Sequence, residues 1–225
     1  MSARRSSSIS NPPLSPSAVP DLAILPAPLA AEKLPVGQLV TKSTKLNPTT
    51  LEDKDYDDGG CRWYKDVILL STSTGLFTES LGGAHLVQKK LEADSSVGTI
   101  EAEQMRVRLL KDADSALKKV LTSEEAKNWI KEHAQNEDVG FVTATREVIN
   151  ASYKRARLVD IGAGNFEVIR EVGGETKEGK RRDSGLDVPL TGSKTDVVGV
   201  VVRKVVVEGN EIKLGNELNA QFWNN

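Results

Sequence analysis

The sequence predicts an α+β domain built on a twisted, mostly antiparallel sheet with packed helices. Two strand-like runs, residues 139–157 and 194–208, are rich in the Val, Ile and Thr that suit a pleated, half-buried surface. Two amphipathic helices are expected between earlier strands and the first of these runs, at residues 112–121 and 122–134. The order of strands, two helices and strands lacks the regular alternation that a parallel sheet requires.

The distribution of proline divides the chain into two parts. Seven of the nine prolines lie within residues 1–35, beside the run Ser6-Ser7-Ser8, and the first aromatic residue is Tyr56. Such a segment cannot recover its ordering entropy by burying side chains. The sequence therefore predicts a flexible tail over residues 1–35 and one folded domain over residues 36–225.

Charge and cysteine content exclude several classes of protein. The formal net charge of -2 argues against a dedicated nucleic-acid binder, and the one cysteine, Cys61, leaves no partner for an internal disulfide. No apolar signal-peptide core follows Arg4 and Arg5, so a reducing cytosolic setting is expected. No apolar run reaches the length of a transmembrane helix, so entry into a bilayer would require a closed barrel of strands.

The first half of the domain is expected to form strands around an acidic turn. Residues 34–46 predict a strand and turn, and residues 62–77 a β-branched and aromatic strand. Between them, Asp53, Asp55 and Asp57 have part of the spacing of a calcium loop. The glycine falls one place late and no glutamate ends the loop, which favours a solvated turn over a calcium site.

A hairpin with one solvated face is expected over residues 85–110. Val87 and Leu91 share a face in its first half, and Met105 and Val107 share a face in its second half. Asp112 then caps the first helix, whose apolar stripe excludes Lys118 and Lys119. Thr122 and Glu125 have the spacing of a capping box for the second helix. His133, in the last turn of that helix, is assigned a structural role.

The stretch LVDIGAGNF, residues 158–166, is the strongest enzymatic signal. It resembles the first motif of S-adenosylmethionine-dependent methyltransferases, in which a glycine turn lets the backbone approach the cofactor. Phe166 occupies the third glycine position, and too few residues follow for a doubly wound sheet. A strand, a turn and a second strand are therefore favoured, and the methyltransferase is kept as an alternative function.

Two basic segments remain in the second half. The loop at residues 173–193 interleaves both signs of charge and is expected to be solvated. Lys154, Arg155 and Arg157 end a strand with no acidic residue among them. They fit a role at an interface, although protection of a strand edge explains them almost as well.

Taken in order, four stretches resemble the gasdermin pore-forming domain, and specifically its short fungal relatives that regulate cell death. The stretches are CRWYKDVILLSTSTGLF at residues 61–77, IEAEQMRVRLLKDADSALKKVL at residues 100–121, GFVTATREVINASYK at residues 140–154 and VVGVVVRKVVV at residues 197–207. The resemblance covers about residues 34–210. It implies a pore former without enzymatic activity, cofactor or metal.

The resemblance implies a function in fungal non-self recognition, that is, in allorecognition or heterokaryon incompatibility. The chain would bind acidic membrane phospholipids, oligomerise into a β-barrel and permeabilise the plasma membrane in a pyroptosis-like programmed cell death. It would be cytoplasmic when inactive and would bind no nucleic acid. Because residues 209–225 are too few for a repressor domain, control is expected from a homologous or allelic partner chain. An interaction module that does not insert remains a further alternative.

Two sets of residues would carry that function. Lipid headgroups would meet a set of cations: Lys42, Lys45, Lys111, Lys118, Lys119, Lys154, Arg155 and Arg157. The membrane would be spanned by residues 85–110 as one hairpin and by residues 139–157 with 194–208 as a second. The residues assigned to the spanning strands are Val87, Leu91, Met105, Val107, Phe141, Val142, Val148, Val198, Val200 and Val202.

Overall fold

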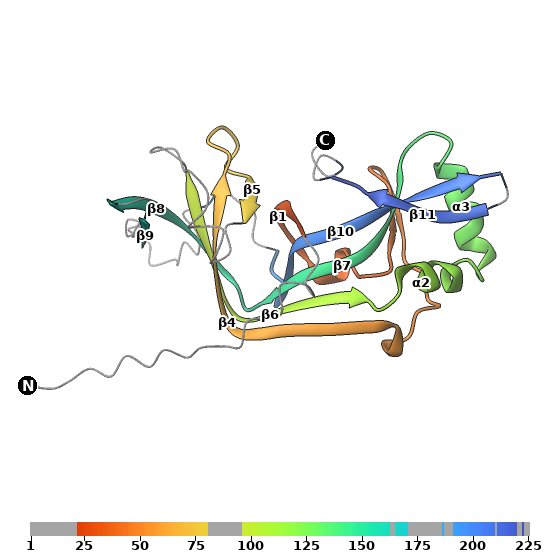
Figure 1. Ribbon diagram of the computed structural model, residues 1–225, viewed down its shortest axis with the longest axis horizontal. Helices are drawn as coiled ribbons and strands as arrows, with labels where there is room; N and C mark the ends of the chain where they lie inside the picture. The colour runs from red at the N-terminus through yellow and green to blue at the C-terminus, as the bar shows by residue number, and fades with distance from the viewer. Residues whose placement is uncertain are drawn as a thin grey trace, which may run out of the picture.

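The computed structural model describes residues 22–80, 96–162, 165–170, 186, 191–209, 211–219 and 222. Its described strands join in one antiparallel, eleven-stranded sheet whose main path runs β1-β10-β7-β6-β4-β5 (Figure 1). The strands are β1 Ala23–Ala30, β2 Leu39–Val40, β3 Lys45–Leu46, β4 Tyr56–Leu70, β5 Phe77–Ser80, β6 Val97–Leu110, β7 Val139–Ile149, β8 Ser152–Gly162, β9 Asn165–Arg170, β10 Thr195–Glu208 and β11 Glu211–Glu217. The helices are α2 Ala113–Val120 and α3 Glu124–His133. The prediction of a mostly antiparallel α+β domain is confirmed at this level.

Four long neighbouring strands form the centre of the sheet. β4 pairs with β6 from Tyr56↔Leu110 to Leu69↔Val97, and β6 pairs with β7 over the second half of its length. β7 pairs with β10 from Val139↔Val205 to Ile149↔Thr195. The predicted pairing of residues 139–157 with residues 194–208 is thereby confirmed for β7.

The two helices pack at one end of the sheet, beside β11 (Figure 1). The Asp112 carboxylate accepts a hydrogen bond from the Ser115 backbone N–H at 3.0 Å, which confirms the predicted cap of α2. Ser123 caps α3, one residue later than predicted. The Thr122 hydroxyl instead donates to the Lys119 carbonyl at 2.7 Å, at the end of α2. The apolar face of α2 enters a buried cluster with Leu39, Val139 and Phe141 of the sheet.

The segment predicted as a flexible tail contributes a strand to the sheet. Residues 1–21 lie outside the described residues, but Ala23–Ala30 form β1 along the edge of β10, and Ala31–Lys33 form a 3-10 turn. The predicted flexible tail is therefore wrong for residues 22–35. Leu25, only 1% exposed, packs in a buried cluster with side chains of β7 and β10. The prolines of β1 are tolerated because β1 is an edge strand.

The partner of β6 also differs from the sequence prediction. The expected first hairpin paired residues 85–93 with residues 99–110. Residues 81–95 lie outside the described part of the chain, and both edges of β6 are occupied without them. β4 covers one edge, while β8 and then β7 cover the other. The strand that pairs with β6 along its whole length is therefore β4, and not residues 85–93 as predicted.

The predicted run at residues 139–157 forms two strands, β7 and β8, which lie end to end beside β6. β6 pairs with β8 from Val97↔Ala156 to Glu101↔Ser152 and with β7 from Gln104↔Ile149 to Leu109↔Ala144. The register is the same on both sides, so β8 continues β7 past an interruption at Asn150, whose φ is 51°. Asparagine tolerates this left-handed conformation better than most residues.

Candidate membrane-interacting site

The predicted lipid-binding cations fall into two groups at opposite ends of the sheet. Lys111, Lys118 and Lys119 lie on and just before α2, whereas Lys154 and Arg155 lie on β8, at the far end in Figure 1. Lys42 and Lys45 lie in the β2–β3 segment, which pairs with the start of β7 near the helices. Arg157 belongs to β8, and its side chain lies outside the described atoms. The structure therefore brings together the cations near α2 and separates them from those on β8.

Several of these cations already have partners within the chain. Lys119 makes an ion pair with Asp55, and the Lys111 ammonium donates to the Lys54 carbonyl oxygen at 2.9 Å. The Lys45 ammonium donates to the Lys33 carbonyl oxygen at 2.8 Å. Sequence reasoning missed these contacts, because Lys119 and Asp55 are 64 residues apart.

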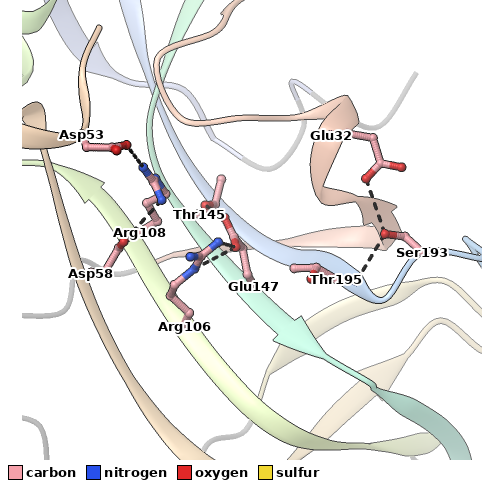
Figure 2. A network of polar contacts seen from close by, with 9 residues as sticks. All are labelled: Glu32, Asp53, Asp58, Arg106, Arg108, Thr145, Glu147, Ser193 and Thr195. Carbon is pink, nitrogen blue, oxygen red and sulfur yellow. Dashed lines mark hydrogen bonds and ion pairs between the residues drawn. The ribbon is translucent and has the colours of Figure 1, made fainter.

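The acidic turn before β4 lies against this basic region. Asp53 is 3.7 Å and Asp58 3.3 Å from the Arg108 guanidinium (Figure 2). The same guanidinium lies over the Tyr56 ring, 4.2 Å from the ring centroid. The hydrogen bond from Lys119 holds the pKa of Asp55 below its usual range. The turn thus places carboxylates against the cations Lys119 and Arg108. Its role as a solvated acidic turn agrees with the sequence prediction.

The residues assigned to spanning strands are core residues in this conformation. Seven of the residues assigned to the spanning strands are valines or phenylalanines on β6, β7 and β10 that the structure describes. Six of the seven are at most 2% exposed, and the seventh, Val107, is 3% exposed. The seven are Val107, Phe141, Val142, Val148, Val198, Val200 and Val202. Met105 packs partly buried against the cluster around Ile100. Val87 and Leu91 lie outside the described residues. Exposure of these side chains to lipid would require the core to open.

A line of three residues crosses the sheet where it bends. Trp63 on β4 lies opposite Glu103 on β6, and Glu103 lies opposite Asn150 between β7 and β8, because the pairings on either side keep one register. Trp63 has a φ of 58° and Asn150 a φ of 51°, and these are the only non-glycine residues with positive φ in the described chain. The Asn150 amide donates to the Glu103 carboxylate at 2.7 Å. Figure 1 shows β4 and β6 turning sharply in this region.

The left-handed conformations of Trp63 and Asn150, on either side of Glu103, mark this line as a crease of the sheet. A bulky residue in the left-handed region is unfavourable by about 1–3 kcal/mol and persists only where surrounding structure enforces it. Trp63 is also 78% exposed, so burial of its ring does not compensate. Sequence reasoning missed the crease; an Asn between two strand-forming runs was its available signal.

Three buried carboxylates are held by hydrogen-bond donors on other strands. Glu147 on β7 accepts from the Arg106 guanidinium of β6 (Nε at 3.0 Å) and from the Thr145 hydroxyl at 3.1 Å (Figure 2). Asp66 on β4 accepts from the Ser80 hydroxyl of β5, and also from the Tyr64 hydroxyl of its own strand at 2.7 Å. Asp196 at the start of β10 accepts from the Tyr153 hydroxyl of β8 at 2.9 Å. Burial raises the pKa of Tyr153 and of Tyr64, with the neighbouring carboxylate adding to both shifts.

The methyltransferase alternative is not supported by the local structure. The stretch at residues 158–166 lies in β8 and β9, which pair antiparallel from Ala156↔Arg170 to Gly162↔Asn165. A cofactor turn of that family connects a strand to a helix. The two favoured strands are confirmed, and the expected turn between them, at residues 163–164, lies outside the described residues. Within the described residues, no group of three or more His, Cys, Asp or Glu side chains is arranged to hold a metal ion.

Comparison with known proteins yields likenesses to solved structures alone. No family model matches the chain, and no curated protein matches it. Among solved structures, a bacterial gasdermin from Bradyrhizobium tropiciagri is similar, with 10% sequence identity, 88% of each chain covered and a TM-score of 0.38. At this TM-score the likeness carries no argument, so the function is argued from the strands and charges of this chain. No described helix has the length and apolarity needed to cross a membrane.

Proposed function

We propose that this chain is a pore-forming protein of gasdermin type, which binds acidic phospholipid membranes, self-associates and permeabilises them. Its role is not enzymatic. The observation that carries the proposal is the block of four neighbouring strands β4, β6, β7 and β10, which are 15, 14, 11 and 14 residues long. A strand that spans a bilayer needs about 9–11 residues, and each of the four reaches that length.

The direction of these strands supports assembly of copies into a ring. Each of the three pairings in the block is antiparallel. Because the block has an even number of strands, β4 and β10 at its two edges run in opposite directions. A copy placed head-to-tail beside another would therefore continue the antiparallel pattern, and a closed ring would leave no unpaired strand edge in lipid.

The pattern of side chains on β6 supports the same reading. Gln104, Arg106 and Arg108 alternate with Met105 and Val107. In a barrel, one face of each strand meets lipid and the other meets water. β6 already carries the alternation that both environments require.

Attraction to the membrane would begin at the α2 end. Lys118 is exposed and Lys119 is partly exposed, and each cation near an anionic leaflet contributes about 1 kcal/mol. Acidic phospholipid would compete with the acidic turn for Lys119 and Arg108. We propose that the active chain acts at the plasma membrane after residing in the cytoplasm, and that it binds no nucleic acid.

We further propose that a homologous or allelic partner chain triggers killing in fungal non-self recognition. This part rests on the sequence resemblance. Co-expression tests it: the chain alone should be tolerated, whereas the chain with an incompatible counterpart should kill the cell. Strong toxicity of the chain expressed alone would refute the two-component control.

Leakage of dye-loaded liposomes tests permeabilisation itself. The proposal expects release from vesicles that contain acidic phospholipid and little release from neutral vesicles of the same size. Vesicles that bind the protein but retain their dye would instead identify an interaction module that does not insert.

A further inference from the structure

Strand β1 occupies part of the edge of β10 that faces away from β7, and β11 pairs with the same edge farther along, from Arg203↔Glu217 to Glu208↔Glu211. β1 pairs at Ala23↔Val200 and Ile24↔Gly199, and again at Leu29↔Val197 and Ala30↔Asp196. β7 pairs with the other edge of the same segment of β10. In the described structure this half of β10 therefore has no edge available to another strand. Figure 1 shows β1 lying against β10, away from α2 and α3.

The backbone attachment of β1 is weak for a strand of its length. The register shifts between Ile24 and Leu29, so the two paired segments are separated by an irregular stretch. Pro26 and Pro28 lie in that stretch and have no N–H group to donate to β10. Fewer ladder hydrogen bonds must therefore break when β1 leaves than when a regular strand of eight residues leaves.

Side chains hold β1 in place. Leu25 is 1% exposed and packs in a cluster with Val200 of β10 and Val142 of β7. Ile24 and Ala27 pack against a second cluster that contains Phe77 of β5. β1 thus contacts β10 and also β5, the strand at the other end of the main path. It connects the two ends of the sheet.

Among the described residues, the opposite edge of the four-strand block has no partner strand over most of its length. Beyond β4, the described strands include only β5, which pairs from Leu70↔Phe77 to Ile68↔Ser80. Along the remaining part of β4, Arg62, Trp63 and Lys65 are exposed. An unpaired strand edge is a template for a strand of another chain.

We propose that β1 is a displaceable strand that covers the segment of the β10 edge at residues 196–200, and that this freed segment pairs with the unpaired edge of β4 in a second copy of this chain. This inference rests on the proposed function, since it names the contact through which copies assemble. The opposite directions of β4 and β10 make the pairing antiparallel. While β1 is bound, one of the two edges needed for each contact is occupied, and the chain stays unassembled.

Substitution of Leu25 tests the role of β1 with the full chain. Leu25→Ala removes the main side-chain anchor of β1, and Leu214→Ala on β11 is the matched control, because Leu214 is also buried but lies outside β1. Self-association is measured by chemical crosslinking over a range of protein concentrations. We expect Leu25→Ala to assemble at a concentration about tenfold lower than the wild type, because a truncated buried leucine loses packing. Leu214→Ala should assemble as the wild type does.

A reversible covalent bond tests the same contact from the other direction. Ala23 and Val200 are directly opposite in the ladder, so cysteines at both positions lie within reach of a disulfide. The variant Ala23→Cys, Val200→Cys is made in a Cys61→Ser background, with Val206→Cys, Lys213→Cys as a control disulfide between β10 and β11. Oxidation should block assembly on acidic vesicles for the first pair but not for the control pair, and reduction should restore assembly.

Crosslinking and dye release are scored on the same vesicles, so the two proposals fail separately. Assembly that is blocked by the β1 disulfide but never releases dye would refute the pore and support the role of β1. Assembly of the oxidised β1 variant to the level of the reduced protein would overturn the role of β1, whatever the dye does. Equal assembly of Leu25→Ala and Leu214→Ala would overturn it as well.

Discussion

Reversing the charge of two α2 lysines tests the membrane-binding surface most specifically. Lys118 and Lys119 lie off the buried stripe of α2, which consists of Ala116, Leu117 and Val120. The double variant Lys118→Glu, Lys119→Glu should therefore keep the fold, with a lower free energy of unfolding because a carboxylate at position 119 would face Asp55. It should also lose affinity for vesicles that contain acidic phospholipid.

The expected magnitude follows from the local electrostatics. Each lysine near an anionic leaflet contributes about 1 kcal/mol, so loss of both cations weakens binding by roughly 30-fold. Repulsion of the two new carboxylates adds a factor of similar size. Lys118 makes no ion pair with a carboxylate in the described part of the chain, whereas Lys119 is held by Asp55. The single variant at Lys118 should therefore have the larger effect of the two.

The assay is co-sedimentation with acidic vesicles near physiological ionic strength, where the Debye length is about 8 Å. Lys127→Glu, Lys131→Glu on α3 is the control, because it makes the same change in net charge on the neighbouring helix. The control variant should lose less affinity than the α2 variant. Unchanged co-sedimentation of a folded α2 variant, or equal losses for the two helices, would refute the assignment of the surface to α2.

The remaining predictions concern the strands. Met105→Lys should abolish dye release while vesicle binding persists, since a lysine on the lipid-facing side of a barrel is unfavourable by about 2–4 kcal/mol near the midplane. Gln104→Lys, its neighbour on the opposite face, should release dye normally; full release by Met105→Lys would exclude β6 as a spanning strand. Tyr153→Phe should lower the free energy of unfolding by about 1.5–3 kcal/mol, because the buried Asp196 carboxylate loses the Tyr153 hydroxyl and keeps only the Thr191 hydroxyl among its described hydroxyl donors. The pKa of Tyr153 is raised in the folded chain, so its contribution to the free energy of unfolding is present below the unfolded pKa of about 10 and is lost as the pH rises above that value. The free energy of unfolding of Tyr153→Phe, measured by urea titration, should therefore fall less steeply at alkaline pH than that of the wild type.

Elements with local signals could be predicted from the sequence. α2 could be predicted from the spacing of its apolar residues and from Asp112, whose carboxylate caps the helix by accepting from the Ser115 backbone N–H. β6 follows from the alternation of polar and apolar residues. The cap of α3 was misplaced by one residue because Thr122 and Ser123 both carry a hydroxyl, and the Thr122 hydroxyl is engaged by the Lys119 carbonyl. Nothing local distinguishes the two.

Features that depend on distant partners could not be predicted. β1 is rich in proline, and its sequence alone favours a tail. It forms a strand because its backbone pairs with β10 and because Leu25 packs in a cluster with side chains of β7 and β10. The contacts of Lys119 with Asp55 and of Tyr153 with Asp196 join residues 64 and 43 positions apart. The candidate cations could therefore be identified by type, but their intramolecular partners could not.

The most direct measurement of the central claim follows the environment of β6 residue by residue on acidic vesicles. Single cysteines at positions 103–107, in a Cys61→Ser background, would carry an environment-sensitive fluorophore. Insertion of β6 into a barrel predicts a period of two, with probes at Met105 and Val107 entering lipid and probes at Gln104 and Arg106 remaining in water. Uniform spectra along the strand, unchanged between solution and acidic vesicles, would contradict the account.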